Sequence, residues 1–452
     1  MKIVIVGCGK VGRNIAEELA KEKHELVLVD SDPQIVQETS TFLDAIGVIG
    51  DAASLSTLTE AGVEKADILL AITSKDEVNM LCCLFARKAN PQIKTIARVR
   101  NPVYSKEVQY IKEELGLTLI INPEMATARE IARLIRFPAA MKVEHFSRGR
   151  VEFVSFSVPE GNPLADQKVG DIPKKFNSKV LIVGVERGEE AFIPNGEKVI
   201  KAHDKVSVVA QPSELSNFFA NVGLLLNPIK SVLIVGGSDI AYYLSKLLEG
   251  SNIDVKIIDK DKERCEELAD LLPNASIVFA DGSDDSVLIE EGLENTGAFV
   301  SLTNVDEENV MLSLFARSKS DAKVITKVNR IAFDSVISNL DIGSVVYPKH
   351  ITADNIIKYV RGLMASNSSN ITSLYRILNN KGEVITFKIK NESNITNVAL
   401  RDLKLKDSLL VCTIVRDDSI ITPTGNDEIK VGDLVLIATT NTGIDAIEGI
   451  VK

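Results

Sequence analysis

The sequence contains few histidines and cysteines and no long apolar run. Its four histidines lack the HxxxH or HExxH spacing of a histidine metal site. Apolar runs such as Val180–Val185 and Leu434–Ala438 are far shorter than the roughly 20 residues of a membrane-spanning helix. The cysteines form no CxxC pair and are odd in number, which favours reduced thiols over a disulfide framework: Cys8, Cys82, Cys83, Cys265 and Cys412. We therefore expect neither a metal centre nor direct membrane insertion.

Basic residues are outnumbered by acidic ones. The 452 residues include 52 Lys+Arg and 63 Asp+Glu, which gives a net charge of −11, and no basic block is present. An acidic chain of this kind is a poor ligand for nucleic acid, so we expect no nucleic-acid partner. The apolar stretch at the N-terminus is too short for a signal peptide and leads directly into a glycine loop. These features predict a cytoplasmic protein that reaches a membrane only through a partner.

The chain contains an internal repeat of about half its length. The segments Leu70–Lys88 and Val300–Ser318 are identical at eight of nineteen positions, at an offset of 230 residues. At nearly the same offset, Ile5-Val6-Gly7 matches Ile234-Val235-Gly236, and Asp30 matches Asp259. A period this long, running from end to end, indicates one large unit that has been duplicated rather than a solenoid of short repeats.

Each half begins with short β-branched runs that alternate with helical segments. Such alternation is typical of an α/β fold with a Rossmann-like, doubly wound parallel sheet. In the helical segment Asp76–Ala89, we expect one buried face made by Val78, Leu81, Cys82, Phe85 and Ala89. Another helix is expected over Val11–Lys21, and the predicted strands of the first half are Lys2–Val6, Leu26–Val29, Ala45–Ile49, Ile68–Ala71, Thr95–Val99 and Thr118–Ile121.

The remainder of each half predicts a smaller structure. Short strands separated by Pro and Gly turns are typical of a small α+β module, and they are predicted at Val151–Val158, Lys179–Val185 and Lys205–Ala210. We expect Rossmann-like domains at 1–136 and 226–364, with small modules at 137–225 and 365–452. Linkers are expected at Arg136–Val143, at Asn221–Ile229 and at the polar run Ala365–Ser373.

A glycine loop follows the first strand, with the sequence Gly7-Cys8-Gly9-Lys10-Val11-Gly12. The first glycine permits a tight turn, the second lets a diphosphate approach the backbone, and the third lets helix and strand pack closely. The helix N-terminus then offers N–H groups and a partial positive charge to the phosphate. Asp30, after the second strand, can accept both ribose hydroxyls of an adenosine and would repel a 2′-phosphate. The first half is therefore predicted to bind NAD(H) rather than NADP(H).

The corresponding loop of the second half departs from this pattern. It has the sequence Gly236-Gly237-Ser238-Asp239-Ile240-Ala241, with a serine and an alanine where the first loop has glycines. Asp239 places a negative charge near the phosphate position, while Asp259 retains the ribose-binding acid. Two interpretations remain open: a dinucleotide site, and a structural or weaker nucleotide site.

Further polar residues follow the other strands. Thr73 and Ser74 are expected to face the ligand crevice, and Ser74-Lys75-Asp76-Glu77 also fits a capping box, with Asn304–Glu307 as its counterpart. Arg98, with its counterpart Lys327, is placed to meet a phosphate or carboxylate. Asp51 and Asp281 follow the third strands, where they line the adenosine side or cap the next helix. No side chain lies in a recognisable catalytic constellation, so we expect no enzymatic activity.

These features together resemble the TrkA family. The resemblance covers essentially all 452 residues and implies two tandem RCK units, each an RCK-N Rossmann domain followed by an RCK-C module. It is carried by KIVIVGCGKVGRNIAEEL at the N-terminus, Asp30, GDAAS after the third strand, LAITSKDEVNMLCCLFAR and the whole-chain duplication.

The resemblance implies a cytosolic regulatory subunit of a Trk-type potassium transport system. Such a subunit would be peripheral on the inner face of the cell membrane, held there by a channel subunit, and would assemble as a homotetrameric ring. NAD(H) is implied in the first domain and ADP, ATP or NAD(H) in the second, with the bound ligand gating potassium flux. By position, the ligand residues would be Gly7–Val11, Asp30, Asp51, Thr73, Ser74 and Arg98, then Gly236–Ile240, Asp259 and Asp281. The alternatives are a dehydrogenase, which would need a catalytic Lys or His, and a redox-sensing transcriptional regulator, which would need a basic winged-helix segment.

Overall fold

The computed structural model describes residues 1–452 except 23, 102–103, 105–106, 137–139, 147–149, 189, 225–228, 330–336, 338–339, 341, 369–370, 379–380, 418, 442–443 and 445. The chain divides into two units, one formed by Met1–Ile131 with Ser231–Ile357 and the other by Ala132–Lys230 with Lys358–Lys452. Equivalent parts of the two sequence repeats therefore share a unit. The first unit holds two Rossmann-like domains, and the second holds two small modules.

The first Rossmann domain has a six-stranded parallel sheet in the order β3-β2-β1-β4-β5-β6. This order places the switch in winding direction beside β1, where ligands bind in open α/β sheets. The strands are β1 (Lys2–Val6), β2 (Glu25–Asp30), β3 (Ile46–Ile49), β4 (Ile68–Ala71), β5 (Lys94–Arg98) and β6 (Leu119–Ile121). The helices are α1 (Lys10–Lys21), α2 (Pro33–Leu43), α3 (Leu55–Glu60), α4 (Asp76–Ala89), α6 (Val108–Glu114) and α7 (Pro123–Arg136).

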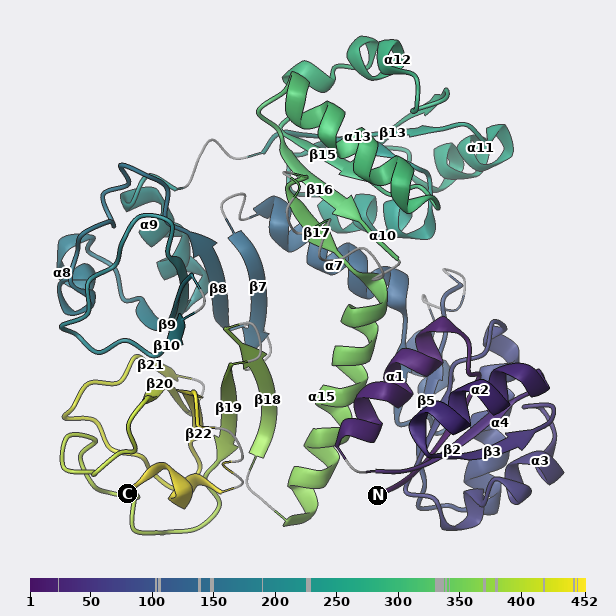
Figure 1. Ribbon diagram of the computed structural model, residues 1–452, viewed down its shortest axis with the longest axis horizontal. Helices are drawn as coiled ribbons and strands as arrows, with labels where there is room; N and C mark the ends of the chain where they lie inside the picture. The colour runs from purple at the N-terminus through teal and green to yellow at the C-terminus, as the bar shows by residue number, and fades with distance from the viewer. Residues whose placement is uncertain are drawn as a thin grey trace. The chain divides into compact units, whose positions relative to one another are not determined.

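The second Rossmann domain repeats this topology in the order β14-β13-β12-β15-β16-β17. Helices α10 and α11 contact β13, and α13 contacts β15 and β16 (Figure 1). The strands are β12 (Ser231–Val235), β13 (Asp254–Asp259), β14 (Ser276–Phe279), β15 (Ala298–Ser301), β16 (Lys323–Lys327) and β17 (Ser344–Val346). The helices are α10 (Asp239–Leu248), α11 (Lys262–Leu271), α12 (Asp285–Glu290), α13 (Asp306–Lys319) and α15 (Pro348–Ser368). The predicted duplicated, doubly wound α/β fold is confirmed.

Helix α4 has the predicted bounds, and its predicted buried face was wrong at Leu81, which is 38% exposed. Cys82 is buried as predicted, Phe85 and Ala89 are partly buried against the core, and the fully buried residues also include Asp76, Asn79, Cys83 and Ala86. This side of α4 packs against β4 and β5, where small side chains allow close approach. The two polar residues are buried because they bond to backbone groups of neighbouring loops, an arrangement that hydrophobic periodicity does not report.

The two small modules each contain a five-stranded antiparallel sheet, in the orders β10-β9-β11-β8-β7 and β18-β19-β22-β20-β21. Side chains from both modules form one shared core, in which Phe146 meets Tyr375 edge-on and Val183 lies with Leu378. The first module comprises β7 (Ala140–Phe146), β8 (Val151–Ser157), α8 (Ile172–Lys175), β9 (Leu181–Arg187), β10 (Glu190–Phe192), β11 (Lys205–Ala210) and α9 (Pro212–Asn221). The second comprises β18 (Ile371–Ile377), β19 (Gly382–Lys388), β20 (Leu409–Arg416), β21 (Ser419–Ile421) and β22 (Leu434–Thr439).

Two of the predicted linkers are largely regular structure. Helix α15 continues to Ser368 and β18 begins at Ile371, so the expected linker Ala365–Ser373 is mostly helix and strand. Strand β7 begins at Ala140, inside the expected linker Arg136–Val143. For Ala365–Ser373 the prediction failed because polar composition indicates solvent exposure, and helices and strands can have exposed polar faces as well. Part of the third expected linker, Asn221–Ile229, lies outside the described residues.

Among the helices that the structure describes, none is both long and apolar enough to span a bilayer.

Candidate functional site

The two glycine loops share one backbone conformation at their first residue. Gly7 has φ +94° and Gly236 has φ +102°, values that side chains other than glycine rarely adopt. A Cβ added at either position would lie 2.8 Å from backbone atoms of the strand-end residue Ile72 or Leu302. Both turns therefore require glycine, and both bring the loop against the end of the adjacent central strand.

The second and third glycine positions explain how the second loop tolerates its substitutions. Gly9 and Ser238 both have ordinary extended backbones, with φ −62° and −67°, and a Cβ at Gly9 would meet no atom within 4 Å. A Cβ at Gly12 would lie 1.9 Å from the carbonyl oxygen of Gly7, whereas Ala241 is accommodated in the interior. The second loop thus keeps the turn and differs in what it projects: Ser238 Oγ is buried and lacks a hydrogen-bond partner in the described part of the chain.

The acids at the ends of β2 and β13 contact the glycine loops, as the motif predicts. Asp30 Oδ2 accepts a hydrogen bond of 2.7 Å from Cys8 N–H, and Asp259 Oδ2 accepts one of 2.5 Å from Gly237 N–H. The other oxygen of each carboxylate accepts from the backbone two residues later, from Asp32 and Asp261. These contacts fix each carboxylate beside its loop, and carboxylate oxygens have further lone pairs for ribose hydroxyls.

Cys8 lies in the first loop but is a structural residue. It is buried, and its Sγ lies 3.7 Å from the carbonyl oxygen of Val29. Burial, followed by the charge of Asp30, raises the pKa of the Cys8 thiol to about 12. A thiol that stays protonated at neutral pH is a poor nucleophile, so its backbone N–H is the group that serves the site.

The charge beside the second loop is balanced by a residue outside the glycine motif, which the sequence patterns did not identify. Asp239, at the start of α10, accepts a hydrogen bond of 2.8 Å from Arg264 Nη2. Arg264 Nε also donates to the carbonyl oxygen of Gly237 at 2.6 Å. The first domain has Lys10 and Ile35 at the corresponding positions. The acid in the second loop is therefore compensated by an arginine on α11. Alignment of the two repeats shows both differences together, Lys10 against Asp239 and Ile35 against Arg264.

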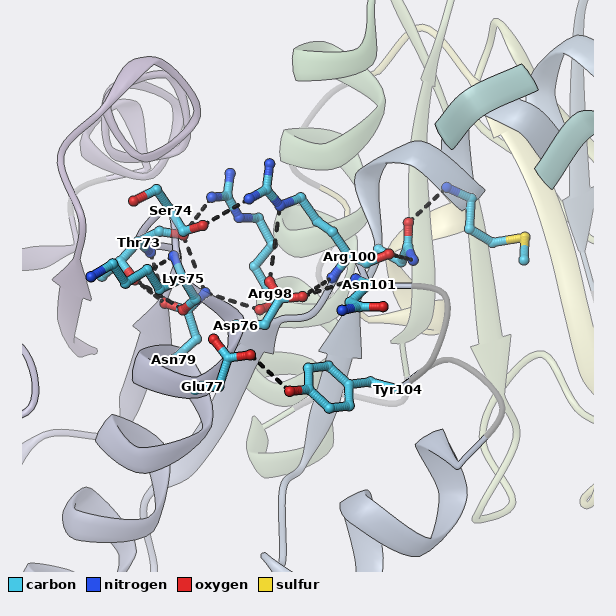
Figure 2. A network of polar contacts seen from close by, with 12 residues as sticks. Thr73, Ser74, Lys75, Asp76, Glu77, Asn79, Arg98, Arg100, Asn101 and Tyr104 are labelled. Atoms are coloured by element: carbon cyan, nitrogen blue, oxygen red, sulfur yellow. Dashed lines mark hydrogen bonds and ion pairs between the residues drawn. The ribbon is translucent and has the colours of Figure 1, made fainter. Parts of the chain in front are cut away.

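Three residues that are identical between the two repeats, Thr73, Asp76 and Asn79, form a polar network under the loop after β4 (Figure 2). Asn79 accepts from the N–H of Thr73 at 2.8 Å and donates to the carbonyl oxygens of Thr73 and Arg98. Asp76 Oδ2 accepts from the N–H groups of Arg100 and Asn101, at 2.8 and 2.9 Å. The network recurs in the second domain through Thr303, Asp306, Asn309, Lys327 and Asn329.

The predicted capping box does not form. Helix α4 begins at Asp76 with Lys75 as its N-cap, and α13 begins at Asp306 with Val305, both without a side-chain cap. Asp76 is engaged by the loop after β5 instead, so a tertiary contact replaces the local one. Asp51 and Asp281 also do not cap helices: each accepts from the backbone two residues later, and the N-caps are Ser54 and Asp284.

Arg98 and Lys327 occupy equivalent places at the ends of β5 and β16. Each donates to a strand-end carbonyl oxygen, Arg98 to that of Thr73 and Lys327 Nζ to that of Leu302. Burial lowers the pKa of both cations, and nearby carboxylates that include Glu124 oppose the shift. Each domain therefore presents one partly desolvated cation at the crevice, where it strengthens attraction to an anion.

Two cavities collect these side chains. One, of about 640 Å³, is lined by every residue predicted for the second site, namely Gly236, Gly237, Ser238, Asp239, Ile240, Asp259 and Asp281. The other, of about 340 Å³, is lined by Lys10, Val11 and Arg98 of the first site. The other residues predicted for the first site do not line it: Gly7, Cys8, Gly9, Gly12, Asp30, Asp51, Thr73 and Ser74. The cavity of about 640 Å³, at the second site, is within the usual size range of small-molecule sites.

Each cavity also contains residues from the other Rossmann domain. Pro123 and Glu124, at the start of α7, line both cavities, as does Pro348, at the start of α15. Lys349 lines the smaller cavity with Lys10. The glycine motif did not point to these residues. Their equivalent placement after the last strand of each sheet was the available signal in the sequence.

Comparisons with known proteins agree with this architecture. The model of the TrkA-N domain matches residues 3–123 and 232–348, and the model of the TrkA-C domain matches 153–223 and 384–452. The Trk system potassium uptake protein TrkA homolog 2 of Methanosarcina mazei is 31% identical, with 100% of both chains covered. The Trk system potassium uptake protein TrkA of Halomonas elongata is 30% identical over 97% of this chain and 95% of its own.

A solved structure shares the fold. The GsuK channel bound to NAD matches with a TM-score of 0.64 and 17% identity, over 97% of this chain and 77% of that one. The relatives are named as potassium uptake proteins, in agreement with the prediction that the chain is not an enzyme. With two TrkA-N and two TrkA-C domains in tandem, and full-length relatives at this level of identity, the chain belongs to the TrkA family of potassium uptake proteins.

Proposed function

We propose that this protein is a nucleotide-binding regulatory subunit of a Trk-type potassium transport system. The observation that carries the proposal is the duplicated strand–glycine-turn–helix arrangement, in which a strand-end carboxylate accepts a hydrogen bond from each loop. Membership of the TrkA family supports the link to potassium transport. The protein would act from the cytoplasm, on the inner face of the membrane, through a channel subunit.

The first site would bind NAD(H), and the second NAD(H), ADP or ATP. In the first, the glycine loop Gly7–Gly12 and Arg98 would hold the diphosphate, Asp30 and Asp51 would face the adenosine ribose, and Thr73 and Ser74 would line the crevice. In the second, Gly236–Ile240, Asp259 and Asp281 would play the same parts. The NAD-bound state of the GsuK channel, which shares this fold, supports the choice of ligand.

Ligand binding would be coupled between the two domains. Tyr243, on the helix that begins at the second glycine loop, donates to the carbonyl oxygen of Arg100 at 2.9 Å and accepts from Asn122 Nδ2 at 3.0 Å. Arg100 lies two residues after Arg98 of the first site. The hydrogen bonds of Tyr243 therefore connect the segment next to the first site with helix α10 of the second domain. A ligand changes gating only by its differential affinity for two arrangements of such domains. The domains proposed are 1–136, 137–225, 226–364 and 365–452, in a homotetrameric ring.

The proposal is tested by co-purification and flux. The tagged protein should retain a Trk-type channel subunit from membranes, and potassium flux through the reconstituted pair should differ among NADH, NAD, ADP and ATP. Light scattering of the purified protein should give a mass well above the 49.2 kDa of one chain. Flux that is identical with and without every nucleotide, in a complex that does assemble, would contradict the regulatory role.

A further inference from the structure

Strand β3 forms one edge of the first Rossmann sheet, and its outer side carries no other strand in the described part of the chain. It pairs with β2 in parallel and without a break in register. Edge strands of natural proteins usually have charged side chains, proline or a bulge that discourages pairing with another chain. The sequence of β3 is Ile46-Gly47-Val48-Ile49, so none of these protections is present. The main chain of β3 is therefore open to an added strand.

Four large apolar side chains are exposed around this edge. Ile46 and Ile49 of β3 are 56% and 57% exposed. Phe42, near the end of α2, is 66% exposed, and Leu55, at the start of α3, is 48% exposed. Both helices contact β3 (Figure 1). We call these four residues the β3 patch, and exposed apolar side chains that gather in this way mark an interaction surface.

The sequence around the β3 patch is acidic. Between Glu25 and Glu64 it contains eight Asp and Glu residues and no Lys, Arg or His. A cation reaches the patch from another helix, because the guanidinium of Arg13 on α1 lies over the Phe42 ring, 5.2 Å from its centroid. The exposure of Phe42 leaves ring surface for a second cation. Apolar side chains among acids favour a partner that is both apolar and basic.

The equivalent edge of the second domain lacks this combination. Strand β14 pairs with β13 as β3 pairs with β2, and Phe279 takes the place of Ile49. Phe279 is 60% exposed, but it is the one exposed large apolar side chain of the described segment Asp254–Glu294. That segment also contains four basic residues. The apolar and acidic edge is therefore a property of the first domain, and Phe279 offers a matched control position.

A second copy of this chain does not suit the edge of β3. If β3 paired with itself in the antiparallel register that sets Ile46 opposite Ile49, Asp44 would lie opposite Asp51 at both ends, and opposing like charges are destabilising. A nucleic acid or an anionic lipid surface would be repelled by the same acids. The cytoplasmic loops of membrane proteins, in contrast, carry an excess of Lys and Arg. Such a loop supplies the complementary charge and an extended main chain.

We propose that the edge of β3, with the β3 patch, is the docking surface for an extended basic segment of the potassium-conducting membrane subunit. The inference rests on the proposed regulatory function and specifies where the partner binds. The segment adds to the sheet beside β3 through main-chain hydrogen bonds, covers the patch with apolar side chains and sets Lys or Arg against the acids. The docked segment lies close to the first nucleotide site, because Ile49 pairs with Asp30 and the N–H of Gly50 donates to the Asp30 carbonyl oxygen at 3.0 Å.

Surface plasmon resonance on the full chain tests this assignment. The probes are the purified Trk-type membrane subunit of the same organism, in nanodiscs of zwitterionic lipid, and short overlapping peptides from its cytoplasmic loops. Ile49→Lys sets a positive charge in the patch, so the Kd for the membrane subunit should rise at least about tenfold. Phe42→Ser, outside the strand, should raise the Kd at least about threefold, and Phe279→Lys should leave it within about twofold. A peptide that binds should contain Lys or Arg beside apolar residues, and its affinity should fall as salt rises.

The outcomes separate the docking surface from the proposed function. If the parent binds the membrane subunit and both Ile49→Lys and Phe42→Ser keep its Kd within about twofold, or if Phe279→Lys weakens binding equally, the docking surface is wrong and the regulatory function stands. If the parent does not bind the membrane subunit, both are refuted. NADH titration checks the fold of each variant, and Phe42→Ser decides if Ile49→Lys does not fold. A smaller assembly in light scattering of Ile49→Lys, with an unchanged Kd for the subunit, would assign the edge to an interface between copies and overturn the proposal.

Discussion

The carboxylate of Asp30 offers the sharpest test of the first site. One of its oxygens accepts from Cys8 N–H at 2.7 Å and the other from Asp32 N–H at 3.1 Å. In the substitution Asp30→Asn, the amide keeps a single oxygen, so one of these donors or a ribose hydroxyl must face an NH₂ group. The change preserves side-chain size, and it removes both the charge and one acceptor.

The size of the effect follows from the hydrogen bonds that this substitution weakens. A hydrogen bond to a charged group contributes about 1.5–3 kcal/mol, and a neutral amide retains part of that value. We therefore expect NADH binding to weaken by about 1.5–2 kcal/mol, which corresponds to roughly 10–30-fold in Kd. The measurement is an NADH fluorescence titration in a Ser238→Asp background, because this substitution projects a carboxylate into the diphosphate position of the second site.

The control is a neighbouring acid with the same charge. Asp32→Asn removes one negative charge two residues away and keeps the side-chain oxygen that caps α2. It should leave the Kd for NADH within about twofold, because exposed charges are strongly screened. The assignment of Asp30 to the ribose is refuted if Asp30→Asn binds NADH as tightly as its parent, or if both substitutions weaken binding equally.

Three further predictions concern other parts of the chain. Gly12→Ala would place a Cβ 1.9 Å from the carbonyl oxygen of Gly7, so NADH binding at the first site should weaken at least about tenfold in the same titration. Asp239→Ala removes the partner of Arg264 and a negative charge from the second cavity, so calorimetry should show ADP binding there strengthened about 3–10-fold. The Asp204 side chain is 1% exposed and accepts two hydrogen bonds from Arg187. Asp204→Ala removes this acceptor, so we expect the free energy of unfolding of the small modules, measured in urea, to fall by about 2–4 kcal/mol.

Local patterns in the sequence predicted the elements and the topology of the Rossmann domains. The strand Lys2–Val6 has the predicted bounds, and Asp30 reaches its loop, because a buried strand, a glycine turn and an amphipathic helix are each specified within a few residues. The duplication carried the same prediction to the second domain. There the loop keeps its conformation with Ser238 in place of glycine, because that position has an ordinary φ and does not require glycine.

Interactions between distant segments lie beyond such patterns. Leu81 was predicted to be buried and is exposed, since the bonds of Asn79 to Thr73 and Arg98 fix the rotation of α4 on its sheet. The capping box failed for a related reason, because Asp76 bonds to the loop after β5. In both cases a polar partner more than five residues away outweighed a local preference.

Part of the lining of each cavity was decided by tertiary structure alone. The sequence identified both glycine loops and both strand-end acids, because those residues act on backbone close to them in the chain or across one strand pair. Arg264 joined Asp239 only because α10 and α11 both pack on β13, and Glu124 entered the second cavity only because the start of α7 lies against the other domain. A pattern in one domain cannot report a side chain supplied by its neighbour, since the distance that matters is set by packing and not by sequence separation.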